Sequence, residues 1–213
     1  WRDDRGESYL TAFRQLGGDC SRLKFDEAAA TACCLCLVTP DSERTMFTHL
    51  GAAQLLHPEE ITPEDFASCN HAHIEGYLLF NPELLMSVLR SARQAGCRVS
   101  LDLGSFGVVT AAREILPSIL ADYVDIVFAN EEECAAYCGH RDPLVGLETL
   151  GALCEVAVVK LGAEGALIRS ATDQVHVPAS PAQTVVDTTG AGDFWAAGFL
   201  YGHQGRYICR PAV

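Results

Sequence analysis

Residues 98–133 read RVSLDLGSFGVVTAAREILPSILADYVDIVFANEEE and contain the pattern that decides the fold. Two short apolar segments, 98–103 and 124–129, have the length of buried strands, and residues 109–123 between them have helical character. Parallel neighbouring strands are joined by a long crossover, usually a helix, and this crossover is right-handed. The stretch therefore predicts an α/β fold with a parallel sheet.

The same alternation continues on both sides of this stretch. Upstream, residues 71–80 predict a strand and residues 81–96 a helix that ends at a glycine. Parallel strands of this kind are covered by helices on both faces, which gives a three-layer α/β/α sandwich with a mostly parallel sheet. Downstream we expect helices at 131–139, 143–154 and 190–203, and strands at 155–161, 165–170 and 174–179.

The first fifty residues do not fit this alternation. Residues 7–16 have apolar side chains at helical spacing and end at a Gly-Gly pair, which predicts a helix. Residues 33–38 and 44–50 predict two strands, and the turn-rich stretch between them predicts a hairpin. We find no linker and no repeat, so residues 1–213 are expected to form one domain with this hairpin outside the main sheet.

Composition excludes several classes of function. The chain has 28 acidic and 15 basic residues, a net charge of −13, and its basic residues are scattered. Nucleic acids and anionic membranes need a basic patch, so we expect neither as a partner. No apolar run approaches the roughly 20 residues that span a bilayer, and the first residues lack a signal pattern, so we expect a cytoplasmic protein.

The chain has ten cysteines, and most of them lie in apolar runs. Cys33, Cys34 and Cys36 in the run TACCLCLVT are expected to be buried as small hydrophobic side chains. We expect reduced thiols, as in the cytosol, and no disulfide framework.

Zinc binding is an alternative use of some of these side chains. Cys134 and Cys138 share a helix face with His140 close by, and His71 and His73 share one side of a strand. Neither group has a second pair of ligands to complete a four-ligand site. Core cysteines and a histidine pair at a strand edge are enough to explain both groups, so we do not expect a zinc site.

Polar residues follow several of the predicted strands. They occur at 102–105, 130–133 and 160–165, and again at 187–193 before the last helix. In open α/β sheets, ligands bind beyond the carboxyl ends of the strands. These four clusters therefore predict one site on one edge of the sheet.

The stretch TTGAGD at 188–193 has the composition of an anion site. Gly190 and Gly192 carry no side chains, so the amides of the first helical turn are open to a phosphate, which the helix dipole favours. Asp193 would then lie beside the anion, where a carboxylate can accept a proton from an attacking hydroxyl. The alternative is an aspartate that only stabilises the start of the helix.

The longer stretch DTTGAGDFWAAGFLYG at 187–202 resembles the C-terminal signature of the PfkB family of carbohydrate and nucleoside kinases, which have the ribokinase-like fold. The resemblance implies that Asp193 is the catalytic base and that the amides of Gly190, Ala191 and Gly192 form the anion hole over the transferred phosphoryl group. In members that use a monovalent cation such as potassium, the residues matching Asp187 and Thr189 help to bind it.

Two further motifs match the family. ANEEE resembles its N-x-x-E motif, which implies that Asn130 and Glu133 hold the magnesium and phosphate network through water. KLGAEGAL resembles the nucleotide-binding strand and turn, so Lys160, Gly162 and Gly165 are expected at the ATP. From the residues alone, a charged helix start and an ordinary β-turn explain the two motifs.

The predicted hairpin, at about residues 32–50, resembles the lid that the family closes over its substrate. The whole resemblance implies an ATP-dependent kinase for a hydroxyl of a sugar or nucleoside, with adenosine-kinase-like members favoured. Some relatives dimerise through the lid, which leaves a homodimer open. The family's first strand, Gly-Gly signature and last helices have no counterpart here, so we expect a fragment of the fold, incomplete at both ends. The alternative is an inactive member that binds a nucleotide or a protein partner without turnover.

Overall fold

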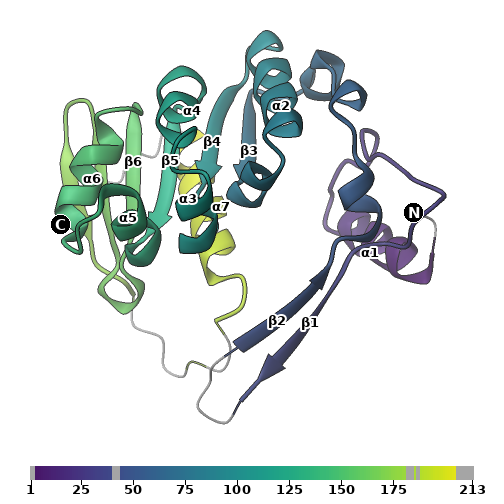
Figure 1. The fold of residues 1–213 in the computed structure, drawn as a ribbon, viewed down its shortest axis with the longest axis horizontal. Helices are drawn as coiled ribbons and strands as arrows, with labels where there is room; N and C mark the ends of the chain where they lie inside the picture. The colour runs from purple at the N-terminus through teal and green to yellow at the C-terminus, as the bar shows by residue number, and fades with distance from the viewer. Residues whose placement is uncertain (1–2, 40–43, 181–184, 186–187, 205–213) are drawn as a thin grey trace.

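The structure, a computed structural model, describes residues 3–39, 44–180, 185 and 188–204. Six strands form the main sheet in the order β3-β4-β5-β6-β7-β8 (Figure 1). The pairs from β3 to β6 are parallel, and β7 and β8 continue the sheet as antiparallel strands. The bounds are β3 (His71–Glu75), β4 (Arg98–Asp102), β5 (Ile126–Asn130), β6 (Val156–Lys160), β7 (Ala166–Ser170) and β8 (Gln174–Val177). The predicted mostly parallel α/β sheet is confirmed.

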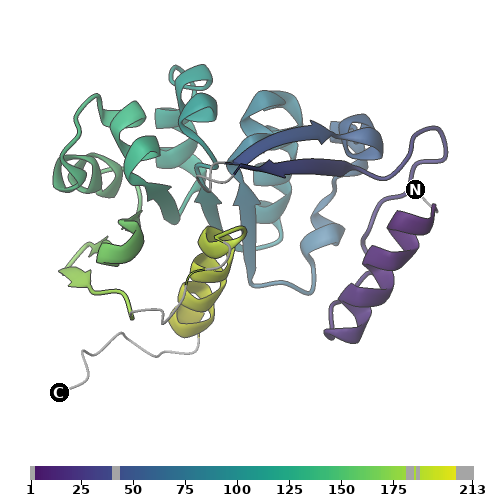
Figure 2. The same ribbon diagram turned by 90° about the horizontal axis from the view of Figure 1, so that it is seen from below.

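Helices cover both faces of this sheet (Figure 2). Buried residues of α2 to α6 form one hydrophobic cluster with one face, and α7 packs on the other. The bounds are α2 (Pro82–Gln94), α3 (Phe106–Ala111), α4 (Leu116–Tyr123), α5 (Glu131–Cys138), α6 (Pro143–Gly151) and α7 (Ala191–Gln204). The three-layer sandwich follows from these two packed faces.

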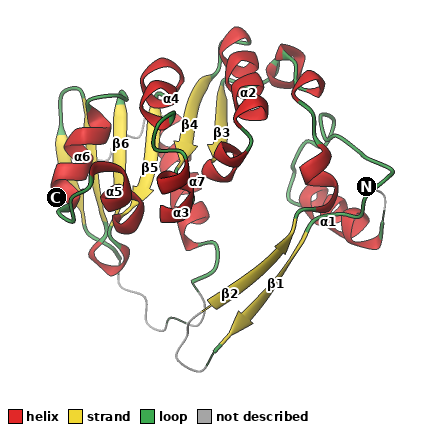
Figure 3. Cartoon of the chain, viewed as in Figure 1, coloured by secondary structure: helices red, strands yellow, loops and turns green. Residues whose placement is uncertain are grey.

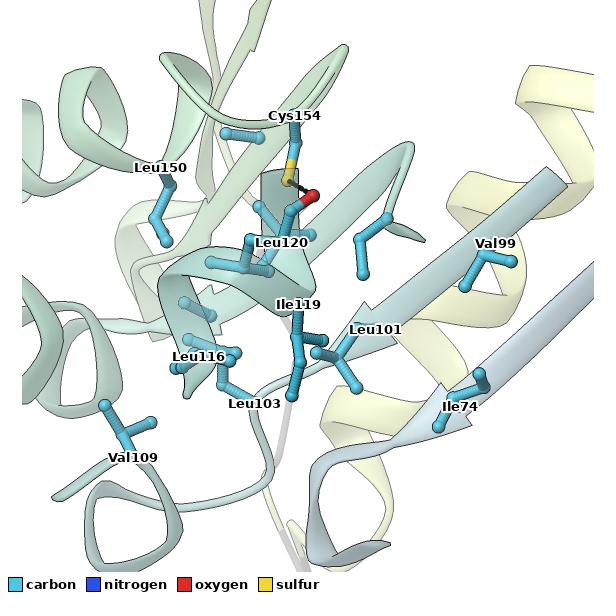
Figure 4. Close-up of a cluster of buried hydrophobic side chains, with 14 of the residues drawn as sticks. Ile74, Val99, Leu101, Leu103, Val109, Leu116, Ile119, Leu120, Leu150 and Cys154 are labelled. Carbon is cyan, nitrogen blue, oxygen red and sulfur yellow. Dashed lines mark hydrogen bonds between the residues drawn. The ribbon is translucent and has the colours of Figure 1, made fainter. Parts of the chain in front are cut away.

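Figure 4 shows the part of the larger core around β4 and the helix α4. Leu116, Ile119 and Leu120 follow the helical spacing that places side chains on one face, and they are buried in the same cluster as Leu101. Fully burying one such side chain contributes about 1.5–3 kcal/mol. The Cys154 thiol donates to the Leu120 carbonyl oxygen (3.8 Å), so this buried cysteine fills space in the core.

The second face of the sheet packs on α7 through aromatic rings. Phe128 of β5 lies edge-on to Trp195 (6.2 Å between ring centroids) and to Phe199 (5.4 Å). Ala196 is buried in the same contact. Such edge-on pairs contribute about 0.5–1.5 kcal/mol beyond the area that they bury. They fix α7 with its first turn at the carboxyl edge of β5 and β6.

The predicted hairpin is confirmed as a separate two-stranded sheet of β1 (Cys33–Val38) and β2 (Arg44–His49), paired antiparallel (Figure 3). It extends past the carboxyl ends of β3 and β4 (Figure 1). It follows α1 (Asp4–Gln15) and precedes three 3₁₀ turns, η1 (Gly51–Leu55), η2 (Pro58–Glu60) and η3 (Pro63–Phe66).

The cysteines of β1 were expected to be buried, and this prediction is wrong. Cys34 and Cys36 are exposed and Cys33 is only partly covered, because β1 and β2 pair with each other as a sheet of their own, and among the described residues no strand of the main sheet pairs with them. Apolar composition did not distinguish a buried strand from a ribbon with two open faces. The nine cysteines of the described residues are free thiols, of which Cys97, Cys134 and Cys154 are buried.

Two predicted elements have different bounds in the structure. The strand expected at 71–80 ends at Glu75 and continues as the 3₁₀ turn η4 (Gly76–Phe80). Gly76 lies so close to the Asp102 and Leu103 carbonyl oxygens that a side chain would overlap them. The helix expected at 109–123 divides into α3 and α4, because Pro117 cannot donate to a helix interior and starts a new helix instead. In the part of the chain described, no helix has the length and apolarity needed to cross a membrane.

Candidate active site

Three neighbouring strands end in polar residues at one edge of the sheet. β4 ends in Asp102, β5 in Asn130 and β6 in Lys160, and parallel strands bring their carboxyl ends together. The Lys160 ammonium reaches across β5 and lies 2.5 Å from the Asp102 carboxylate. The two side chains are only 15% and 10% exposed, so the ion pair is largely shielded from water. The prediction that these strand ends form one cluster is confirmed.

The first turn of α7 lies against this ion pair. A Cβ placed on Gly192 would be 3.4 Å from the Lys160 Nζ atom, so the ammonium lies next to the helix start. Asp193 is exposed in the same turn. Gly190 has φ +75°, a conformation that favours glycine, and its carbonyl oxygen accepts from the Phe194 amide (2.9 Å). The structure therefore places a cation, two glycines and a carboxylate side by side.

One amide of the predicted anion hole has a partner in this structure. The Ala191 amide donates to the Thr188 carbonyl oxygen at 3.1 Å, which closes the turn before α7. An oxyanion that binds the Ala191 amide would have to displace the Thr188 carbonyl oxygen. Thr189 lies in the same turn, and Asp187 lies outside the described residues.

The N-x-x-E motif forms a reciprocal cap at the start of α5. The Glu133 amide donates to Asn130 Oδ1 (2.9 Å), and Glu133 Oε2 accepts from the Asn130 amide (2.8 Å). The Asn130 side-chain amide donates to Glu133 Oε1 (2.8 Å). Glu133 is 2% exposed, and burial raises its pKa to about 7, with the nearby Asp102 charge adding to the effect. Both carboxylate oxygens are thus occupied within the protein.

Gly162 begins the turn η5 (Gly162–Glu164) between β6 and β7, and Gly165 directly follows this turn. Both have positive φ, +56° and +97°. A side chain on Gly165 would overlap the Val177 carbonyl oxygen at the end of β8. The backbone alone therefore explains both glycines, and their contact with a nucleotide stays a prediction.

Sequence reasoning did not single out Tyr77 and Asp102. The Tyr77 hydroxyl donates to the Gly104 carbonyl oxygen (3.2 Å). Burial raises the pKa of Tyr77, as do the nearby carboxylates of Glu75, Asp102, Glu133 and Asp193. The polar end of β4 was the signal for Asp102, whereas Tyr77 lay inside a predicted strand and gave none.

The histidine pair of β3 has a partner within the sheet. His71 Nε2 and His73 Nδ1 each lie 2.8 Å from the Ser100 hydroxyl oxygen, which is fully buried. Within the described ranges, no three His, Cys, Asp or Glu side chains are placed to hold a metal ion. The described structure gives the zinc alternative no support.

Several known proteins are similar to this chain over most of its length. The ATP-dependent ribose-1-phosphate kinase of Halopiger xanaduensis is 29% identical over 204 residues, which cover 93% of this chain and 63% of that protein. The aminoimidazole riboside kinase of Salmonella typhimurium is 29% identical over 210 residues, covering 93% of this chain and 64% of that protein. The chain thus spans less than two thirds of the length of these relatives.

Solved structures are also similar to this chain over most of its length. The crystal structure of adenosine kinase from Sinorhizobium meliloti has a TM-score of 0.87 and 34% identity, covering 96% of this chain and 64% of that one. A putative ribokinase II from E. coli has a TM-score of 0.88 at 22% identity, which supports the fold. The profile of the pfkB family carbohydrate kinases matches residues 2–204. The chain therefore belongs to the pfkB family of carbohydrate kinases.

Proposed function

We propose that this protein is an ATP-dependent kinase that phosphorylates a hydroxyl group of a sugar or nucleoside. The observation that carries the proposal is the placement of the Lys160 ammonium against Gly192, in the turn that also holds Asp193. A cation and a helix start together attract a phosphate group, and a carboxylate beside them can take a proton. Family membership supports the same reaction.

In the proposed reaction, the acceptor hydroxyl attacks the terminal phosphorus of ATP. The new oxygen–phosphorus bond forms as the bond to ADP breaks, and the hydroxyl proton passes to the Asp193 carboxylate. The amides of Gly190, Ala191 and Gly192 receive the negative oxygens of the transferred group. The Ala191 amide must then exchange its Thr188 partner for the oxyanion.

Magnesium would neutralise the charge of the ATP phosphates. Asn130 and Glu133 fit such an ion through its bound waters, because both Glu133 oxygens already accept hydrogen bonds from Asn130. We further propose that Lys160, Gly162 and Gly165 contact the ATP, and that Asp187 and Thr189 hold a monovalent cation such as potassium.

The hairpin β1–β2 is proposed as a lid that closes over the acceptor and excludes water, which would otherwise receive the phosphoryl group. An adenosine-like acceptor is favoured, because the adenosine kinase from Sinorhizobium meliloti is 34% identical over most of this chain. A homodimer through the same hairpin and a place in the cytoplasm complete the proposal.

The test measures ATP consumption with magnesium across adenosine, aminoimidazole riboside, ribose and fructose. We expect turnover with one of these acceptors and a loss of about 100-fold or more in kcat for Asp193→Asn, as for the removal of a general base. Asp122→Asn, an exposed site on α4, is the matched control and is expected to keep full activity.

A different result would support the second class of function. If the folded protein binds ATP, consumes none with any acceptor and does not respond to Asp193→Asn, it is an inactive family member that binds a nucleotide or a partner.

A further inference from the structure

The Lys160 ammonium occupies a place that is unfavourable for a cation on its own. It lies beside the first turn of α7, where the helix dipole is positive. A lysine side chain is flexible and its ammonium is strongly hydrated in water, so a largely buried place beside this helix start is costly for it. A specific contact is therefore needed to hold the ammonium beside Gly192, and in the structure this contact is the hydrogen bond to the Asp102 carboxylate.

The Asp102 carboxylate is itself fixed by the backbone. Its Oδ1 atom accepts from the Gly104 amide (3.1 Å), which leaves Oδ2 to accept from the Lys160 ammonium (2.5 Å). Residues 102 and 160 come from two strands separated by β5, so the contact spans two strand spacings. The carboxylate is thus a rigid anchor for a long and flexible side chain.

The ammonium has more donors than Asp102 uses. A lysine carries three N–H donors, and in the described part of the chain the Asp102 carboxylate is the acceptor bonded to it. The remaining donors are available on the side of Gly192, where the proposed kinase would hold the transferred phosphoryl group. One acceptor on the protein and one on the ligand would then share the same cation.

Stability alone does not account for this pair. A shielded ion pair contributes about as much to the stability of the fold as well-packed apolar residues in its place would, because the cost of removing two charges from water offsets their attraction. Glu133, a further carboxylate, lies near enough for both Asp102 and Lys160 to affect its pKa, so the site already contains excess negative charge. An additional aspartate here is unfavourable for binding a polyphosphate unless it serves another purpose.

We propose that Asp102 is a positioning residue, which holds the Lys160 ammonium beside Gly192 so that the ammonium contacts the phosphoryl group during transfer. This inference rests on the proposed kinase function. Asp102 acts only through Lys160, so its effect must disappear once Lys160 is removed.

The experiment is a double-mutant cycle with Asp102→Asn, Lys160→Met and the combined variant, in which kcat and the KM values for ATP and acceptor are measured. Each single variant is expected to lower kcat by about 100-fold, the effect of losing one stabilising donor, with the KM for the acceptor unchanged. The combined variant is expected to be no slower than Lys160→Met.

Two further variants separate position from charge. Asp102→Glu keeps the negative charge but moves the carboxylate, so it is also expected to lower kcat, and Lys160→Arg is expected to restore part of the activity lost in Lys160→Met. Glu155→Gln breaks the exposed Arg98–Glu155 pair (2.6 Å) at the opposite strand ends and is the control with unchanged kinetics.

The outcomes distinguish this inference from the proposed function. If the wild-type protein turns over and the two single effects multiply in the combined variant, or if Asp102→Glu is fully active, the positioning role is wrong and the kinase remains. If the wild-type protein turns over no acceptor, the proposed function fails. The same cycle is then read as affinity for a non-hydrolysable ATP analogue, where independent effects of the two substitutions again overturn the role of Asp102.

Discussion

At the scale of single residues, Glu133 serves the fold and the candidate site together. Its carboxylate accepts two hydrogen bonds from Asn130 and so caps the start of α5. These hydrogen bonds favour the ionised form of the carboxylate. Burial opposes that charge, and the Asp102 carboxylate opposes it further. The residue is therefore held in an environment that favours its protonated form more than water does.

Glu133 thus makes the stability of the ligand-free protein depend on pH. Burial raises its pKa from 4.5 to about 7, so the folded state keeps a proton that the unfolded state loses. The contribution of the Glu133 proton to the free energy of unfolding is fully present below the ordinary glutamate pKa, falls as pH rises, and is lost above about pH 7. The free energy of unfolding changes by about 3 kcal/mol over this range. Urea unfolding between pH 4 and pH 8 measures this slope.

Glu133→Gln is expected to remove most of that slope, because glutamine does not titrate. The control is Glu132→Gln, an exposed neighbour in the same helical turn, which is expected to leave the slope as it is. An unchanged slope in Glu133→Gln would assign the pH dependence to another group.

At the scale of elements, the contact between α5 and α6 depends on one glycine. Gly146 of α6 lies so close to Cys134 of α5 that a Cβ at this position would overlap the Cys134 sulfur atom. Cys134 is buried, so its sulfur has little room to move. This close approach fixes α5, which carries Glu133, against the rest of the helical layer.

Gly146→Ala is therefore expected to destabilise the protein by about 1–3 kcal/mol, the usual cost of overpacking. Cys134→Ala in the same chain is expected to restore most of this loss, because it removes the overlapping atom. Gly198→Ala is the matched control in a helix, since the added methyl group would meet no atom within 4 Å, and it is expected to stabilise α7 slightly. Thermal unfolding of these three variants and of Cys134→Ala alone checks this, and equal losses from Gly146→Ala with and without Cys134 would contradict it.

The sequence predicted those elements whose pattern is local. The apolar runs at 126–129 and 156–159 are short and bounded by polar residues, and both are strands. Features of these elements that depend on distant contacts were not predicted. The end of β3 at Glu75 follows from the packing of Gly76 on the backbone after β4, and the open faces of β1 follow from the absence of a partner sheet in the described chain.

In the candidate site as well, some features could be predicted from the sequence and others could not. Topology was enough to bring Asp102, Asn130 and Lys160 to one edge, since all three end neighbouring parallel strands. The ion pair between Asp102 and Lys160 joins residues 58 positions apart, and no local pattern specifies which acceptor a lysine finds. Sequence therefore predicted the place of the site better than its internal bonds.

At the scale of the whole molecule, the hairpin has two open faces that need cover. Leu35 and Phe47 are cross-strand partners on one face, and Cys36 and Met46 are partners on the other. Leu35, Met46 and Phe47 are all more than half exposed. An isolated two-stranded ribbon is at best marginally stable in water, so each face is expected to pack on something.

We expect one face to close over the acceptor and the other to pack on a second copy of the chain, so that substitutions on the two faces have different effects. Leu35→Lys places a charge on one face of the hairpin, and Met46→Lys places a charge on the other face. One is expected to convert a dimer to a monomer in light scattering, and the other to raise the KM for the acceptor while the dimer persists. Leu144→Lys, an exposed leucine of α6, is the control for surface charge. If both variants stay dimeric with an unchanged KM, the hairpin neither closes over the site nor forms the contact between copies.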